Sequence, residues 1–166
     1  MMIKMFVMDV DGTLTDGKIY ISSQGEIMKA FSVKDGLGIA KLHSKGIIPV
    51  IITGRNSEIV TERAKELNIT EIIQGVHDKV NILRQVAEKY KCDLNEIAYI
   101  GDDENDLECM KICGINGCPI DAEETVKEIA SFICNRRGGD GAVREFIEYI
   151  LENKNLLISA DASVDE

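Results

Sequence analysis

The sequence contains no apolar run long enough to cross a lipid bilayer, which takes roughly 20 residues. The longest apolar runs, residues 5–8 and 47–52, are far shorter. The first is followed at once by Asp9 and Asp11, which makes it too short and too acidic for a signal peptide. We therefore expect a cytoplasmic protein that has no membrane partner.

The sequence also has no CxxC pair, although it contains 5 cysteines. Soft-metal sites usually show tighter paired spacing, and an odd number of cysteines without an export signal does not indicate a disulfide framework. Cys109 and Cys113 could share a helix face and bind a metal. Buried or half-buried free thiols are the favoured interpretation for all of them: Cys92, Cys109, Cys113, Cys118 and Cys134.

Positive charge is scarce, since 19 lysines and arginines face 29 acidic residues and give a formal net charge of −10. An acidic surface disfavours non-specific binding to nucleic acid, so we expect no nucleic-acid partner. It also works against anionic substrates. Any phosphate site in this chain must therefore supply its own local positive charge.

Repeats and low-complexity segments are absent, and 166 residues suit one compact domain. Short apolar runs alternate with helical patterns, which predicts a parallel sheet covered by helices on both faces. We expect an α/β fold, a Rossmann-like three-layer sandwich. Its strands are predicted at residues 4–8, 48–52, 71–74, 97–100, 115–117 and 131–133.

One stretch breaks the alternation directly after the first strand. Residues 18–21 and 27–31 resemble two strands joined by residues 22–25, which predicts an inserted β-hairpin. A helix follows at about 36–44, and Ser57 is a plausible N-cap of the next one. Apolar periodicity ends after Leu157, so we expect residues 153–166 to form a mobile tail.

Two acidic residues, Asp9 and Asp11, directly follow the first predicted strand. Buried carboxylates are costly unless a cation or hydrogen bonds neutralise them. Their i, i+2 spacing lets one carboxylate face a metal and attack phosphorus while the other reaches the leaving group. A solvated Asp-Gly turn with Asp9 as a cap is the alternative.

Thr53, Gly54 and Arg55 follow the strand predicted at 48–52. Ligands of open α/β sheets bind in the crevice at the carboxyl ends of the strands. A hydroxyl and free backbone amides there can bind a phosphoryl oxygen, and a helix that begins near Ser57 adds partial positive charge. An ordinary N-cap box is the alternative.

A second acidic cluster, GDDEND at 101–106, follows the strand predicted at 97–100. Mg²⁺ takes oxygen ligands, often one or two carboxylates with waters and substrate phosphate. An acidic helix N-terminus explains Glu104 well, but it explains Asp102 and Asp103 less well because they adjoin the buried strand. Lys79 alone indicates only solvated surface, yet a phosphoryl-transfer site with several carboxylates needs a cation besides the metal.

Taken together, these segments resemble the four motifs of the haloacid dehalogenase superfamily: DVDGTLTDG at 9–17, ITGR at 52–55, Lys79 and GDDxxD at 101–106. The hairpin and three further segments are similar to the capless 3-deoxy-D-manno-octulosonate 8-phosphate phosphatases and their sialic-acid-pathway relatives. Those segments are VKDG at 33–36, QGVxDK at 74–79 and RGGxGAVRE at 137–145. The resemblance covers roughly residues 3–151, so we expect one phosphatase domain over 1–152.

The resemblance implies a role for each motif. Asp9 would form an aspartyl-phosphate, and Asp11 would protonate the leaving group and then activate water. Thr53 and Lys79 would hold phosphoryl oxygens. Mg²⁺ would bind Asp9, the Asp11 carbonyl and Asp102, with Asp103 and Asp106 in support.

The resemblance also implies a substrate and an assembly. The substrate would be a small phosphorylated sugar acid, with Gly54, Arg55 and Arg137 in its binding site. Arginine after Thr53-Gly54 favours the eight-carbon octulosonate, and a nine-carbon nonulosonate phosphate is the alternative. Because no insertion is long enough for a cap domain, we expect a homotetramer whose neighbouring subunits close each site.

Two other classes of protein stay open on the sequence alone. A signalling receiver domain also forms an aspartyl-phosphate on an α/β sheet, but its phosphorylated aspartate lies near the middle of the chain. Here the middle offers only Asp78 and Asp93, neither of which follows a clear apolar strand. A non-catalytic binding or oligomerisation module of the same fold is the other alternative, against which the complete set of motifs argues.

Overall fold

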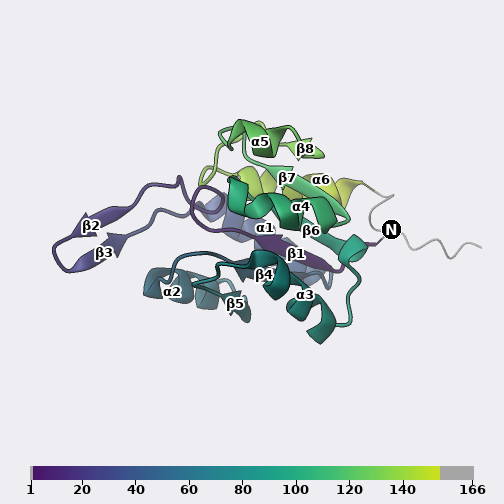
Figure 1. The fold of residues 1–166 in the computed structure, drawn as a ribbon, viewed down its shortest axis with the longest axis horizontal. Coiled ribbons are helices and arrows are strands. Elements are labelled where there is room, and N and C mark those ends of the chain that lie inside the picture. Colours follow the sequence, from purple (N-terminus) through teal and green to yellow (C-terminus); the bar gives the residue numbers. More distant parts are fainter. Residues whose placement is uncertain (1, 154–166) are drawn as a thin grey trace, which may run out of the picture.

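The computed structural model describes residues 2–153, and its centre is a six-stranded sheet in the order β5-β4-β1-β6-β7-β8 (Figure 1). All neighbouring strands in this sheet are parallel. Every strand predicted for the sheet is present, with differences only at the ends. The bounds are β1 Met5–Met8, β4 Ile48–Ile52, β5 Glu71–Ile73, β6 Ile97–Ile100, β7 Ile115–Cys118 and β8 Phe132–Ile133.

Helices cover both faces of the sheet, which confirms the predicted three layers. In β1, Phe6 and Met8 belong to one apolar core and Met5 and Val7 to the other, and all four are fully buried. This alternation follows from the two-residue period of a strand. The first core is closed by α1 Val33–Ser44, α2 Glu58–Glu66 and α6 Ala142–Glu152, and the second by α3 Lys79–Lys89, α4 Leu107–Ile112 and α5 Glu124–Lys127.

The apolar stripe of α6 shows why these helices pack as they do. Val143, Phe146, Ile147 and Ile150 lie at helical spacing and are fully buried. Each such side chain stabilises the fold by roughly 1.5–3 kcal/mol when it leaves water. The same helix packs closely against α1. A Cβ added to Gly38 of α1 would lie only 2.9 Å from the Arg144 side chain, so a glycine is needed at this contact.

The predicted hairpin is present as β2 Tyr20–Ser22 and β3 Gly25–Met28, and it projects away from the sheet (Figure 1). Both strands lie closer to the turn than expected, because Ser22 pairs with Gly25 and leaves a two-residue reversal. The Ser22 hydroxyl fixes that reversal by accepting from the Gln24 amide, and Gly25 adopts a φ of +112°. The hairpin occupies the position where a cap domain would begin.

Helix α1 begins at Val33, earlier than expected, because the Ser32 side chain accepts a hydrogen bond from the Lys34 amide. Ser57 does precede α2, but its hydroxyl makes no cap bond and donates to Glu26 instead. Two short 3₁₀ turns, η1 Leu94–Glu96 and η2 Glu104–Asp106, flank β6.

Between Gly17 and Thr53 the structure holds only the hairpin, α1 and β4, so there is no cap domain in that interval. Apart from Asn153, the predicted mobile tail lies outside the described residues. Across residues 2–153, none of the helices has the length and apolar character that a membrane span requires.

Candidate active site

The sequence motifs meet at one edge of the sheet because three neighbouring strands, β4, β1 and β6, end there. Asp9 follows β1, Thr53 follows β4, and Asp102 comes shortly after β6. The backbone continues the parallel ladder as far as Asp9, whose amide donates to the Ile100 carbonyl at 3.1 Å. A cavity of about 160 Å³ opens at this edge, and its lining residues are Asp9, Asp11, Thr53, Gly54, Arg55, Asp103 and Asn105.

Lys79 is not among the lining residues and is buried, with 3% of its surface exposed. Its ammonium donates to Asp9 Oδ1 at 2.7 Å and to Asp106 Oδ1 at 2.8 Å. Burial lowers the pKa of Lys79, but the charges of the two carboxylates outweigh it and the net direction is upward. Lys79 is therefore a protonated part of the site, and the solvated-surface alternative is wrong.

Asp106 serves this lysine. Its side chain is fully buried, and it accepts from the Tyr99 hydroxyl at 2.7 Å and from the Asp102 amide at 3.1 Å. With the Lys79 bond, both of its oxygens are engaged by donors. These bonds let the Asp106 carboxylate orient Lys79 and the turn after β6, while its predicted support of the metal stays a prediction.

Asp9 and Asp102 are the two carboxylates suited to a metal ion. One oxygen from each of Asp9, Asp102 and Asp106 lies within 4.8 Å of the others. Burial raises the pKa of Asp9 to about 6 and that of Asp102 to about 8, and the neighbouring carboxylates add to both shifts. A divalent cation would offset the carboxylate repulsion that contributes to these shifts, and hard oxygen donors fit Mg²⁺.

Glycines shape the loop that carries Asp9 and Asp11. Gly12 adopts a φ of +94°, and a Cβ there would lie 1.9 Å from Asp102 Oδ2. A Cβ on Gly138 would lie 1.9 Å from the Gly12 carbonyl oxygen, and the Gly139 amide donates to the Thr13 carbonyl at 3.0 Å. The Arg-Gly-Gly segment therefore packs directly against the aspartate loop.

Four residues around the site were not predicted as part of it: Thr13, Glu26, Lys29 and Tyr99. The Thr13 hydroxyl donates to Asp102 Oδ1 at 2.9 Å, and Lys29 forms a close ion pair with Asp11. Burial lowers the pKa of Lys29, but its bonds to Asp11 and Glu26 outweigh this and raise it. Only Tyr99 could have been found from the sequence. It lies in a buried strand beside the second acidic cluster, and a buried hydroxyl needs a hydrogen-bond partner.

The predicted substrate-binding residues separate into two groups. Gly54 and Arg55 line the cavity. Arg137 is not among its lining residues, and its exposed guanidinium pairs with Asp121 at 3.3 Å. Asp103 lines the cavity and also caps η2 by accepting a hydrogen bond from the Glu104 amide, and its supporting role at the site stays a prediction.

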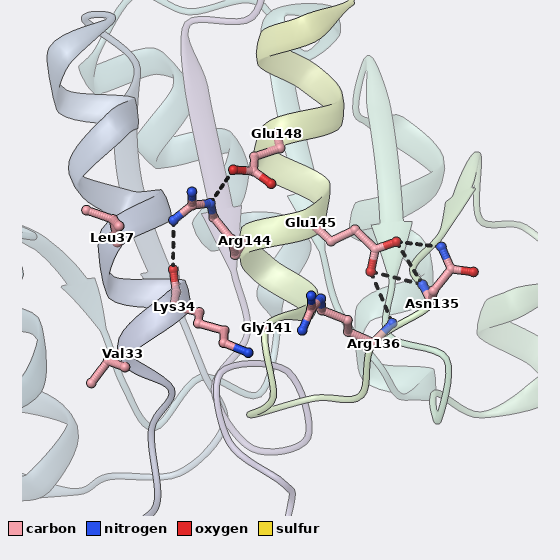
Figure 2. A pocket seen from close by; sticks show the side chains of 9 residues that line it. All are labelled: Val33, Lys34, Leu37, Asn135, Arg136, Gly141, Arg144, Glu145 and Glu148. Atoms are coloured by element: carbon pink, nitrogen blue, oxygen red, sulfur yellow. Dashed lines mark hydrogen bonds and ion pairs between the residues drawn. The ribbon is translucent and has the colours of Figure 1, made fainter.

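A larger cavity of about 690 Å³ lies between the N-terminal ends of α1 and α6 (Figure 2). Its acidic groups already have partners: Glu148 binds Lys41 and Arg144, and Glu145 accepts from the Asn135 and Arg136 amides. Arg144 also donates to the Lys34 carbonyl, which joins the two helices. These bonds favour a structural role for Arg144.

The cysteines are free thiols, as the sequence analysis favoured. Burial raises the pKa of Cys109 to about 12, and Cys113 shifts in the same direction. Neither belongs to a group of potential metal ligands among the described residues. Protonated thiols, buried at Cys109 and half-buried at Cys113, explain this pair better than a metal site does.

The fold and this site define a Rossmann-like α/β protein with a carboxylate–lysine centre, and comparisons with known proteins identify its family. Residues 64–147 match the family model of haloacid dehalogenase-like hydrolases. The 3-deoxy-D-manno-octulosonate 8-phosphate phosphatase KdsC of Yersinia pestis is 39% identical over 149 residues, 90% of this chain and 80% of that protein. KdsC of Escherichia coli K12 is 36% identical over 99% of this chain and 84% of that protein.

Solved structures give the same result. The phosphatase from Yersinia pestis superposes with a TM-score of 0.89 at 38% identity, covering 93% of this chain and 84% of that one. The phosphatase from Moraxella catarrhalis, in complex with magnesium, phosphate and KDO, has a TM-score of 0.88 at 46% identity, covering 90% and 86%. The chain belongs to the haloacid dehalogenase superfamily and, within it, to the capless 3-deoxy-D-manno-octulosonate 8-phosphate phosphatases.

The family resemblance and the predicted enzyme class, a phosphatase, are thereby confirmed. The receiver-domain alternative is wrong. The roles of individual site residues, in contrast, stay predictions.

Proposed function

We propose that this phosphatase hydrolyses 3-deoxy-D-manno-octulosonate 8-phosphate with Mg²⁺ through an aspartyl-phosphate on Asp9. The observation that carries the proposal is the position of Asp9, which lines the cavity while the buried Lys79 binds its Oδ1. The second oxygen is left to attack phosphorus. The names of the curated relatives and the magnesium, phosphate and KDO bound to the Moraxella catarrhalis enzyme support the substrate and the metal.

The proposed chemistry follows from the residues around the cavity. Asp9 is the nucleophile, and Asp11 exchanges protons with the leaving oxygen and with water. Thr53 and the Gly54 amide bind phosphoryl oxygens, and Lys79 places a fixed positive charge beside the reacting carboxylate. Asp9, the Asp11 carbonyl and Asp102 would hold Mg²⁺, which supplies charge neutralisation at the phosphoryl group when bound.

Arg55 supports the choice of an eight-carbon sugar acid. Its side chain lines the cavity next to Thr53, where a guanidinium can pair with a substrate carboxylate. A nonulosonate 9-phosphate is the second candidate. Measuring kcat/KM for both esters tests the choice: we expect the octulosonate ester to be preferred, and a preference of about tenfold or more for the nine-carbon ester, about 1.4 kcal/mol, would overturn it.

Binding of Mg²⁺ is expected to strengthen as the pH rises from about 5.5 to 8. The pKa of Asp9 is raised to about 6 and that of Asp102 to about 8, so at the lower pH the ion must displace protons. A fixed Mg²⁺ concentration should therefore raise Tm more at pH 8. Asp102→Asn should reduce the increase at pH 8, whereas equal increases at both pH values would contradict the assignment.

The assembly is proposed to be a homotetramer in which neighbouring subunits close the site. Large apolar side chains on the hairpin are exposed, with Ile21 67%, Ile27 58% and Met28 50% accessible. A group of exposed apolar residues on a projecting element is typical of an interface. Light scattering should give a tetramer that Ile21→Asp dissociates, and an active monomer would refute this. The cytoplasmic location stays a prediction.

A further inference from the structure

Lys29 contacts Asp11 but has no role in the chemistry proposed above. It lies just past the end of β3, at the base of the hairpin, and its side-chain exposure is 0%. A buried ammonium is costly unless charged or polar partners surround it. Its two ion-pair partners are Asp11 and Glu26, the latter with Nζ 2.9 Å from Oε1.

These contacts continue toward the Thr53–Arg55 segment. Glu26 also accepts a hydrogen bond from the Ser57 hydroxyl, and the Ser57 amide donates to Gln74 Oε1 at 2.8 Å. Ser57 closely follows the Thr53–Arg55 segment that lines the cavity. Lys29 is thus held on one side by a fixed carboxylate, and its other bond goes to Asp11 Oδ1.

Asp11 lines the same cavity as Asp9 but is more exposed, with 20% of its side chain accessible against 8% for Asp9. A carboxylate on a loop can rotate, and proton exchange with the leaving oxygen requires a defined direction. The Lys29 bond restrains Oδ1 and leaves Oδ2 for the proton.

We propose that Lys29 is a positioning residue that holds the Asp11 carboxyl in the orientation needed for proton transfer. This inference rests on the proposed function. In the first step, an Asp9 oxygen bonds to phosphorus, the ester P–O bond breaks, and the departing oxygen takes the proton of Asp11. Asp11 is then a carboxylate beside the Lys29 ammonium, which favours the charge that has developed.

In the second step, the oxygen of a water molecule bonds to the phosphorus of the aspartyl-phosphate. One water proton moves to Asp11, the bond between phosphorus and the Asp9 oxygen breaks, and inorganic phosphate leaves. Asp11 has regained its proton, and no oxidant or other co-reactant is needed. In both steps Lys29 keeps its proton and acts only through Asp11.

The alternative is that Lys29 only fastens the hairpin to the body of the protein. The two roles differ in their dependence on the leaving group. A sugar alkoxide needs a proton to depart, whereas p-nitrophenolate does not at neutral pH. Because kcat/KM reports the steps through departure of the leaving group, a misplaced Asp11 should slow only the sugar ester.

The test measures kcat/KM of Mg²⁺-loaded wild type, Lys29→Met and Asp11→Asn with two esters. One is p-nitrophenyl phosphate, and the other is whichever of the octulosonate 8-phosphate and nonulosonate 9-phosphate wild type turns over faster. For Lys29→Met we expect a loss on the order of 10²-fold with the sugar ester and little change with the aryl ester. Lys18→Met is the matched control, because Lys18 lies in the same segment with its side chain 74% exposed; we expect no change with either ester.

The outcomes separate two failures. Equal losses of Asp11→Asn on both esters would refute the proton-transfer role of Asp11, and with it the proposed mechanism. The other failure concerns Lys29 alone. If Asp11→Asn lost kcat/KM only with the sugar ester, while Lys29→Met lost equally with both esters or with neither, only the role of Lys29 would be refuted. The double variant should lose no more on the sugar ester than Asp11→Asn alone, because both changes act at one proton transfer.

A second variant decides the matter if Lys29→Met does not fold. Glu26→Gln keeps the shape of the side chain but removes the charge that holds Lys29 from the hairpin side. We expect a smaller loss of several-fold, again confined to the sugar ester. A loss of the same size on both esters would overturn the proposal.

Discussion

Asp9→Asn is expected to lower kcat by about 10⁴-fold or more at saturating Mg²⁺ and substrate. The amide has nearly the same shape as the carboxylate but lacks the anionic oxygen that attacks phosphorus. Acid-quenched wild type should carry one phosphoryl group in its intact mass, and the variant none. Asp93→Asn, a change of the same kind at the cap of η1, should leave kcat unchanged.

The same substitution should not lower the stability of the metal-free protein at pH 8. Burial raises the pKa of Asp9 to about 6, so the ionised form is less favourable in the folded than in the unfolded chain. A neutral amide removes that penalty, although it gives up the charge opposite Lys79. Retained Tm with lost turnover would assign Asp9 to catalysis, whereas turnover within tenfold of wild type would refute the aspartyl-phosphate.

The positions of the strands and helices along the chain could be predicted from the sequence because they depend on local patterns. Near-continuous apolar runs such as β1 and β6 are typical of strands covered on both faces, and the intervening helices carry apolar stripes. Asp9, Thr53 and Asp102 follow such strands, and parallel strands present their carboxyl ends at one edge. Strand order was not predicted, and the adjacency of β4, β1 and β6 decides that these three residues meet.

The contacts between distant side chains could not be predicted in this way. Lys29 reaches Asp11 across 18 positions, and Lys79 reaches Asp9 across 70. No spacing rule connects such pairs, because the fold of the intervening hairpin and helices decides where each side chain points. Lys79 could be predicted as a site residue because it matches a motif of the family. Lys29 matches no such motif and was not predicted.

The hairpin shows a different limit. Two strand-like stretches joined by residues 22–25 indicated the hairpin, but the position of the reversal depends on the Ser22 hydroxyl and on the positive φ of Gly25. Such turn chemistry shifts a register by a residue or two without changing the pattern that predicts the strands. The existence of the hairpin was therefore predictable, and its exact ends were not.

Lys79→Met is expected to affect both stability and turnover. The substitution leaves two buried carboxylates, Asp9 and Asp106, without the ammonium that lies between them. Breaking a buried ion pair by removing one partner costs about 3–5 kcal/mol, and loss of a fixed charge at the phosphoryl site costs about 10²–10³-fold in kcat. Lys4→Met, at a half-exposed pair with Glu96, should cost far less stability, because solvent screens that pair.

The stability loss should depend on pH in a defined direction. Without Lys79 the pKa of Asp9 in the folded protein rises further above its unfolded value, so the folded state binds more protons. Stability therefore falls as the pH rises, and thermal melts should show a larger deficit at pH 8 than at pH 5.5. A deficit that is the same at both pH values would contradict the charge argument.

A second substitution separates the two roles of Lys79. Asp106→Asn in the Lys79→Met background removes one of the unpaired carboxylates and keeps an acceptor oxygen for the Tyr99 hydroxyl. Part of the lost stability should return at pH 8, because the repulsion between Asp9 and Asp106 is gone. Turnover should not return, since no cation faces the phosphoryl group from this side. If stability and turnover recovered together, Lys79 would only compensate buried charge and would have no part in phosphoryl transfer.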